Sequence, residues 1–170
     1  ETDNLTVGGA QGSDGQVLTS TGSGVAWEDA ASGGASNVNG LSDAKTFGTS
    51  SIMIGDASTG TIDAANYNVG LGVDVFAALT SGDGNIAIGF AALDANTTAS
   101  YNVGIGYNAL GVNTTGQQNI AIGASSLDAN TTGGENVAVG TGALGANTTA
   151  DSNTAVGHNA LLVNTTGASN

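Results

Sequence analysis

The chain has 170 residues and a mass of 16.2 kDa, and its 14 acidic residues against a single basic one, Lys45, give a formal net charge of -13. One lysine cannot form the basic patch that nucleic acids require, so we expect no nucleic-acid partner. The lack of Cys excludes disulfides and thiolate metal sites, and the apolar runs are too short for a membrane span, so we expect no membrane insertion.

Residues 1-50 lack the repeat that fills the rest of the chain, and we expect a Gly/Ser-rich β connector segment there. The short apolar runs at 17-18 and 25-27 predict two short strands between Gly-Ser turns. The stretch 32-40 is rich in Gly, Ser and Asn, which is typical of a linker or loop. We therefore place the boundary of the connector near residue 50.

A 17-residue repeat fills the chain from residue 51, and Asn170 opens a further unit, so the array ends inside a repeat. The seven units are 51-67, 68-84, 85-101, 102-118, 119-135, 136-152 and 153-169. The last five align without gaps, whereas 68-84 has three extra residues before its Phe-Ala-Ala-Leu and three fewer after it. The unchanged unit length indicates that each unit occupies a fixed structural slot.

Each unit begins with a period-two pattern that is typical of a short strand. Positions two and four, such as Ile86 and Ile88, are mostly Ile, Val or Leu, so we expect them to form the buried face. A glycine follows at position five, which indicates a positive φ or a close backbone approach. In the five regular units these glycines are Gly89, Gly106, Gly123, Gly140 and Gly157.

A second apolar pair follows at positions nine and eleven of the regular units, where Leu is paired with Ala or Val. We favour a second strand here, and a single helical turn is the alternative. The leucines at position nine are Leu93, Leu110, Leu127, Leu144 and Leu161.

Asn-Thr-Thr then occupies positions twelve to fourteen of the regular units. Asn and Thr close turns, and stacked Asn amides can also bond one another as a ladder along the coils. These asparagines are Asn96, Asn113, Asn130, Asn147 and Asn164. Positions six, seven and fifteen to seventeen vary, so we expect solvent-facing loops there.

Together these patterns predict an all-β fold, a repetitive β-solenoid or β-roll of 17-residue coils. Each coil offers only about four modest apolar side chains, and burying each large one stabilises the fold by roughly 1.5-3 kcal/mol. Ordering the backbone costs about 1-2 kcal/mol for each of the 17 residues. Bonds between coils add stability, but a stack this thin is marginal. We therefore expect a homotrimer, intertwined or side by side, whose chains share one core.

No enzyme, cofactor or metal site is expected from the candidate reactive residues. The only histidine, His158, stands at variable position six, where a loop role is favoured over a general base. The acids match neither a calcium-loop pattern nor a regular carboxylate pair for glycan hydrolysis, so we expect them to keep an acidic surface soluble. Each Asn-Thr-Thr, like Asn4-Leu5-Thr6, matches the N-glycosylation sequon, but recurrence at one position favours a turn or ladder role.

The stretch NTAVGHNALLVNTTG (153-167) resembles the NTAIGYNAL-NTTG repeats of bacteriophage tail fibres and related bacterial fibrous adhesins, with His158 where those repeats usually have Tyr. The segment GSDGQVLTSTGSGVAWED (12-29) is similar to a module of the same kind of proteins. Residues 38-56 are similar to fibre sequences of marine, especially cyanobacterial, phages. More distantly, the array is similar to the shorter head repeats of YadA-like trimeric adhesins.

This resemblance implies a homotrimeric, β-rich fibre that is extracellular or on a virion surface. The expected function is a structural shaft or adhesin segment for host attachment, with a host cell-surface glycan or protein receptor as partner. The alternatives are a non-phage extracellular filament or adhesin, a monomeric solenoid that binds ice or polysaccharide through Thr/Asn rows, and a polysaccharide depolymerase.

Overall fold

The computed structural model describes residues 6-7, 10-11, 16-20, 25-29, 44-47, 51-54 and 64-170. Contacts divide the chain into two compact units, residues 1-42 and 43-170. All regular structure in the described residues is β. The second unit includes a strand on the N-terminal side of residue 51, so it begins earlier than the repeat array does.

The first unit contains two antiparallel strand pairs. The first is formed by β1 (Thr6–Val7) and β2 (Ala10–Gln11), and the second by β3 (Gln16–Ser20) and β4 (Val25–Asp29). The two short strands expected at 17-18 and 25-27 lie within β3 and β4. The expected linker at 32-40 lies outside the described residues.

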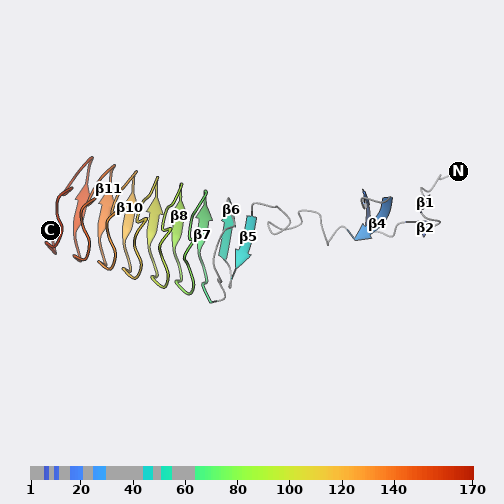
Figure 1. Ribbon diagram of the computed structural model, residues 1–170, viewed down its shortest axis with the longest axis horizontal. Helices are drawn as coiled ribbons and strands as arrows, with labels where there is room; N and C mark the ends of the chain where they lie inside the picture. Colours follow the sequence, from blue (N-terminus) through green and yellow to red (C-terminus); the bar gives the residue numbers. More distant parts are fainter. Residues whose placement is uncertain are drawn as a thin grey trace. The chain divides into compact units, whose positions relative to one another are not determined.

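The second unit is a parallel β-solenoid, which confirms the predicted all-β repeat fold (Figure 1). Its sheet comprises β5 (Ala44–Phe47), β6 (Ser51–Ile54), β7 (Val69–Leu71), β8 (Ile86–Ile88), β9 (Val103–Ile105), β10 (Ile120–Ile122), β11 (Val137–Val139) and β12 (Thr154–Val156). Strand β5 pairs antiparallel with β6, and all later neighbours pair in parallel. Ile86 pairs with Val103, so each step of the sheet advances by one repeat.

The unit at 68-84 follows the coil path without any shift, as expected if each unit occupies a fixed structural slot despite its changed interior. Phe76 fills the slot that Leu93 fills in the next coil, and Leu79 replaces the asparagine of position twelve. The Leu79 amide donates to Phe76 O at 3.1 Å, as the Asn96 amide donates to Leu93 O at 3.2 Å. Backbone bonds between coils fix the path, so the core side chains change while the chain keeps its register.

The strands bury the opposite side from the one predicted. In β8 the buried residue is Ala87, at position three, and Ile86 beside it is 37% exposed. The space behind the strand is narrow: a Cβ added to Gly104 would lie 3.3 Å from Leu93 Cγ. From β7 onward only Ala or Gly occupies this position, and the large side chains of positions two and four point outward.

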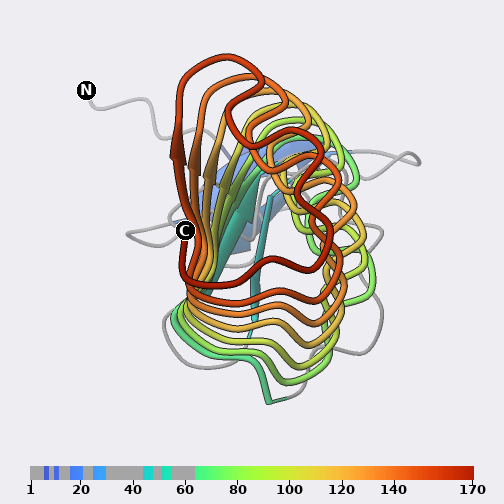
Figure 2. The same cartoon turned by 90° about the vertical axis from the view of Figure 1, so that its left-hand side faces the viewer.

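Positions six to twelve form a series of tight turns instead of the expected second strand or helical turn. Ala91 and Leu93 both have left-handed backbones, with φ of 54° and 52°, and the same alternation recurs in later coils. Residues in that region cannot continue an extended strand or a right-handed helix. Viewed along the stack, the strands occupy one side and the turns the other (Figure 2).

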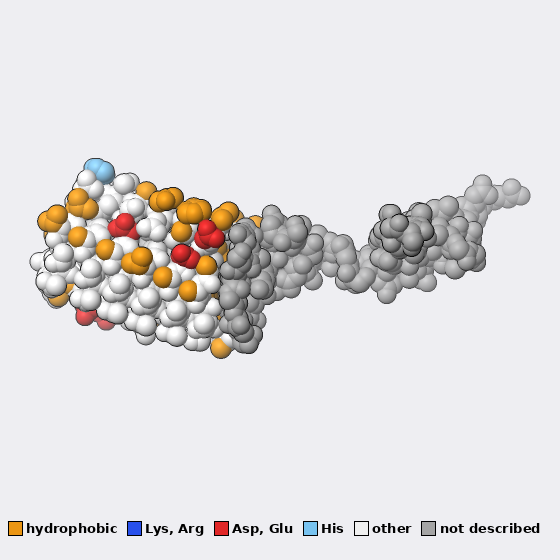
Figure 3. Space-filling view, viewed as in Figure 1, with side chains coloured by type: hydrophobic (Ala, Val, Ile, Leu, Met, Phe, Trp, Pro, Cys, Tyr) orange, Lys and Arg blue, Asp and Glu red, His pale blue; other side chains and the backbone are white. Residues whose placement is uncertain are grey.

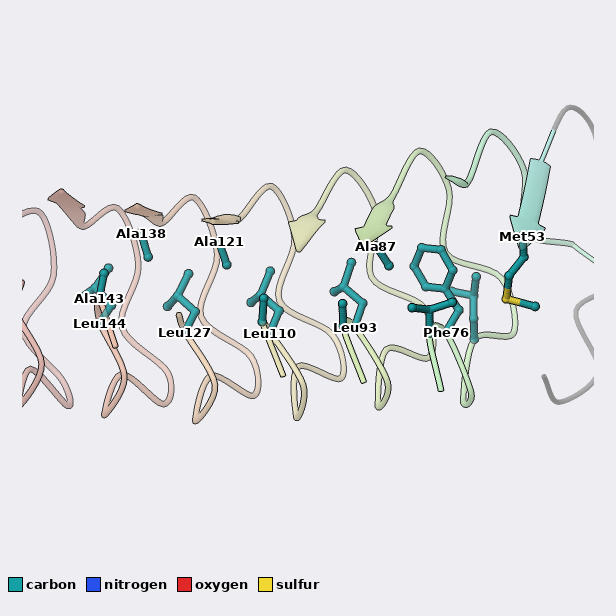
Figure 4. Packing of buried hydrophobic residues seen from close by; sticks show 14 of the residues in the cluster. Met53, Phe76, Ala87, Leu93, Leu110, Ala121, Leu127, Ala138, Ala143 and Leu144 are labelled. Atoms are coloured by element: carbon teal, nitrogen blue, oxygen red, sulfur yellow. The ribbon is translucent and has the colours of Figure 1, made fainter. Parts of the chain in front are cut away.

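A column of position-nine leucines forms the centre of the core (Figure 4). Leu93, Leu110, Leu127 and Leu144 are all 0% exposed and pack against the position-three alanines. Phe76 continues this column at position nine, and Met53, at position three of β6, lies in the same core at its N-terminal end. In the last coil Leu161 is 39% exposed, because no further coil packs on it.

Candidate functional site

The outward side chains of positions two and four make two apolar columns, which we call the strand face. The first column is Ile52, Val69, Ile86, Val103, Ile120, Val137 and Thr154, and the second is Ile54, Leu71, Ile88, Ile105, Ile122, Val139 and Val156. From Ile54 to Ile122, the exposed members are 37-48% accessible. The face carries no charged side chain, although the chain has a net charge of -13.

Aromatic side chains border the strand face on both sides. Position six, just after each strand, carries Phe90 and Tyr107, whose rings stack with centroids 5.5 Å apart and planes 13° apart. Position seventeen, just before the next strand, carries Tyr67 and Tyr101. These four side chains are 47-64% exposed. We call the two borders the position-six margin and the position-seventeen margin.

A buried asparagine ladder runs along the start of the strands, and the sequence interpretation missed it. Asn85 Oδ1 accepts a hydrogen bond from the backbone N–H of Asn102 at 2.9 Å, and the side-chain Nδ2 of Asn102 donates to Gly116 O at 2.9 Å. The same pattern links Asn68, Asn85, Asn102, Asn119, Asn136 and Asn153, all 0% exposed. The signal was present in the sequence, because these asparagines open every unit from residue 68.

The Asn-Thr-Thr asparagines are buried in a second row. Asn113 Nδ2 donates to Gly116 O at 2.9 Å, which closes the turn three residues on. Two hydrogen bonds also join side-chain amides of successive coils, from Asn130 Nδ2 to Asn113 Oδ1 at 2.9 Å and from Asn147 Nδ2 to Asn130 Oδ1 at 3.1 Å. Asn96 and the other three are 0% exposed, so an oligosaccharide on any of these four amides is incompatible with the folded array.

The position-five glycines combine both predicted features, a positive φ and a close approach to the backbone of the adjacent coil. Gly89 has a φ of 124°, and Gly106 has one of 136°. A Cβ added to Gly89 would lie 2.5 Å from Gly106 O, which belongs to the adjacent coil. Gly123 and Gly140 share this geometry, whereas Gly157 would meet only Ala160 Cβ at 4.0 Å.

The two threonines of each Asn-Thr-Thr differ in their exposure to solvent and in their hydrogen bonds. The first donates its hydroxyl to the next coil, as from Thr97 to Thr114 O at 3.1 Å and from Thr114 to Thr131 O at 3.0 Å. The second, such as Thr115 or Thr132, is exposed and repeats once per coil. The side drawn in Figure 3 is mostly polar side chains and backbone, with hydrophobic side chains in rows and few acids.

The titratable groups in the part of the chain that the structure describes do not gather into a metal-binding cluster. Burial raises the pKa of Asp94, with help from the charge of Asp74, and burial likewise raises the pKa of Asp128. The exposed His158 has its Nε2 3.1 Å from Asn159 Nδ2. Among the residues that the structure describes, no three His, Cys, Asp or Glu side chains are grouped to hold a metal ion.

Comparisons with protein-family models, curated proteins and solved structures found no match to this chain. Within the described part of the chain, no helix is long and apolar enough to cross a membrane. The surface features that remain for a functional argument are the strand face, its aromatic margins and the exposed threonine row.

Proposed function

We propose that the chain is a structural shaft or adhesin segment of a homotrimeric extracellular fibre, a phage tail fibre used for host attachment. The observation that carries the proposal is the strand face, which leaves two columns of Ile, Val and Leu in water along the sheet. Soluble monomers rarely expose a continuous apolar patch beyond a few hundred Å².

The size of the strand face suits a stable contact between copies. Six of its side chains are 37-48% exposed, Val156 is 70% exposed, and the remaining apolar members are partly buried. Together they leave on the order of 800 Å² of mainly apolar surface, comparable with the ~800 Å² per partner of a standard interface. The array also repeats every 17 residues, so another copy carries columns with the same spacing. A second and third copy are therefore the partners that fit this face best.

Charge supports the same arrangement. The strand face is uncharged, whereas Asp94, Asp128 and Asp151 lie on the turn side of the coils or at their corners. Turning three strand faces toward a common axis buries the apolar columns and leaves these three aspartates in water. Backbone and asparagine bonds between coils then resist extension of the rod, and its variable loops remain free to contact a host glycan or protein receptor.

The test is the solution mass of the full chain, measured by light scattering after gel filtration. We expect an elongated particle of three times the 16.2 kDa chain mass. Ile122→Asp, on the strand face, should convert it to monomers with an unchanged circular dichroism spectrum. Thr132→Asp, at an exposed position outside the strand face, is the matched control and should remain trimeric. A wild-type monomer would refute the proposal.

Attachment to a virion is a separate part of the proposal. Antibodies against the chain should label tail fibres in electron micrographs of virions. Labelling of cell-surface filaments alone would refute the phage assignment and favour the non-phage filament or adhesin.

The exposed threonine row favours a second candidate, a monomeric solenoid that binds ice or polysaccharide. Thr98, Thr115, Thr132 and Thr149 are exposed at one position of successive coils, about 4.8 Å apart. Thermal hysteresis or polysaccharide binding by a monomeric protein, lost in Thr115→Val/Thr132→Val, would support it. A trimer without either activity would rule it out.

A further inference from the structure

We propose that Tyr101 of one copy packs against the stacked Phe90 and Tyr107 of the next copy, and that this contact fixes the axial register of the assembled chains. The inference rests on the proposed homotrimer. It concerns which residues make the contact between chains and at what height along the rod.

The symmetry of a closed trimer brings opposite margins together. When three parallel copies turn their strand faces toward a common axis, each contact between neighbours is heterologous. The position-six margin of one copy therefore meets the position-seventeen margin of the next. Both margins carry exposed aromatic side chains in the same stretch of the array, from Tyr67 to Tyr107.

The heights of the aromatic residues match. Phe90 follows β8 and Tyr107 follows β9, so their stacked rings span two adjacent levels of the sheet. Tyr101 lies on the turn that leads into β9, at the level of Tyr107. In a closed ring, equivalent residues of the three copies lie at the same height, so Tyr101 of one copy is level with this pair of the next, whereas an axially shifted, open assembly separates them.

The direction of the Tyr101 ring gives independent support. A Cβ added to Gly84 would lie 2.9 Å from Tyr101 Cδ1. Gly84 precedes β8, so the Tyr101 ring leans from the level of β9 toward that of β8. It covers the same two levels as the Phe90–Tyr107 stack, and the glycine leaves the room for it to do so.

The apolar columns alone do not define the axial register between copies, because they are almost identical from coil to coil. A slip of one coil replaces Ile120 with Val103 or Val137 and costs the columns little. The margins do change: the position-six row has Val73 before the stack and Ala124 after it, and the position-seventeen row has Gly84 and Gln118 on either side of Tyr101. A slipped assembly loses the aromatic contact and cannot close as a ring.

The test is photochemical cross-linking of the native tyrosines in the full chain, by ruthenium-sensitised oxidation with persulfate. The chain has three tyrosines, Tyr67, Tyr101 and Tyr107. Tyr101 and Tyr107 of one chain lie at opposite ends of β9, roughly 15-20 Å apart in an extended chain, so a dityrosine between them forms only between copies. Mass spectrometry after digestion with a broad-specificity protease identifies the linked pair.

We expect covalent dimers and trimers on denaturing gels, joined by Tyr101–Tyr107 linkages. Tyr101→Phe and Tyr107→Phe should each reduce these products at least ten-fold, and the control Tyr67→Phe should leave them unchanged. A trimer by light scattering that yields no Tyr101–Tyr107 linkage would overturn the inference and leave the proposed function standing. A monomer by light scattering would overturn both.

Discussion

Gly106→Ala should be among the most damaging single substitutions in the array. Gly106 has a φ of 136°, and a Cβ built there would lie 2.6 Å from the carbonyl carbon and oxygen of Gly123. Holding a non-glycine residue in that backbone region costs about 1-3 kcal/mol. The contact is also about 1 Å shorter than the normal carbon separation of ~3.5-4.0 Å, so the two coils must separate locally.

That separation weakens the backbone bonds on either side of the contact. The Gly106 amide donates to Ile88 O at 2.8 Å, and the Gly123 amide donates to Ile105 O at 2.8 Å. At ~0.5-1.5 kcal/mol for each of the two bonds, their loss brings the total to about 2-6 kcal/mol. Since whole domains are stable by only ~5-15 kcal/mol, this loss is large.

Urea unfolding followed by circular dichroism, in parallel with two control variants, separates the two causes. Gly157→Ala has a similar φ of 127° but its nearest contact is 4.0 Å away, so only the backbone cost of ~1-3 kcal/mol should remain. Gly134→Ala lacks a positive φ, with Gln117 O 3.1 Å away, and should change stability by under ~1 kcal/mol. Equal stability of Gly106→Ala and Gly134→Ala would refute the reasoning.

Three further predictions concern the core, the ladder and pH. Leu110→Ala removes a fully buried side chain and should cost ~2-5 kcal/mol in urea unfolding, more than Leu161→Ala in the open last coil. Asn119→Ala leaves the buried Asn136 backbone N–H without its acceptor and removes one of the two donors to Gly133 O, so it should cost ~2-5 kcal/mol, whereas an effect under ~1 kcal/mol would contradict a structural ladder. Folding raises the pKa of Asp94 and Asp128, so the folded state binds more protons, and the free energy of unfolding should increase as pH falls through their raised pKa values toward 3.8. Asp94→Asn should increase stability at pH 7 and reduce the pH dependence of stability, and an unchanged pH profile in this variant would contradict the prediction.

The all-β solenoid could be predicted because its determinants are local and repeated. A strand pattern, a glycine and a turn recur every 17 residues, and stacking is the arrangement that lets each coil bury its apolar side chains against a neighbour. The position-five glycines were recognised for the same reason. The buried ladder from Asn68 to Asn153 was missed because an asparagine before a strand looks like an ordinary turn residue until the next coil supplies its bonds.

The sequence alone determined the period, the strand that opens each repeat and the position-five sites where only glycine fits. Only the tertiary structure decided which side of each strand faces the core. Alternation places Ile86 and Ile88 opposite Ala87 but does not say which set is buried. The thickness of the coil decides which set is buried. The left-handed turn at Leu93 brings its side chain close behind the strand, so there is room there for the small Ala87 side chain, and the larger Ile side chains are left exposed on the strand face.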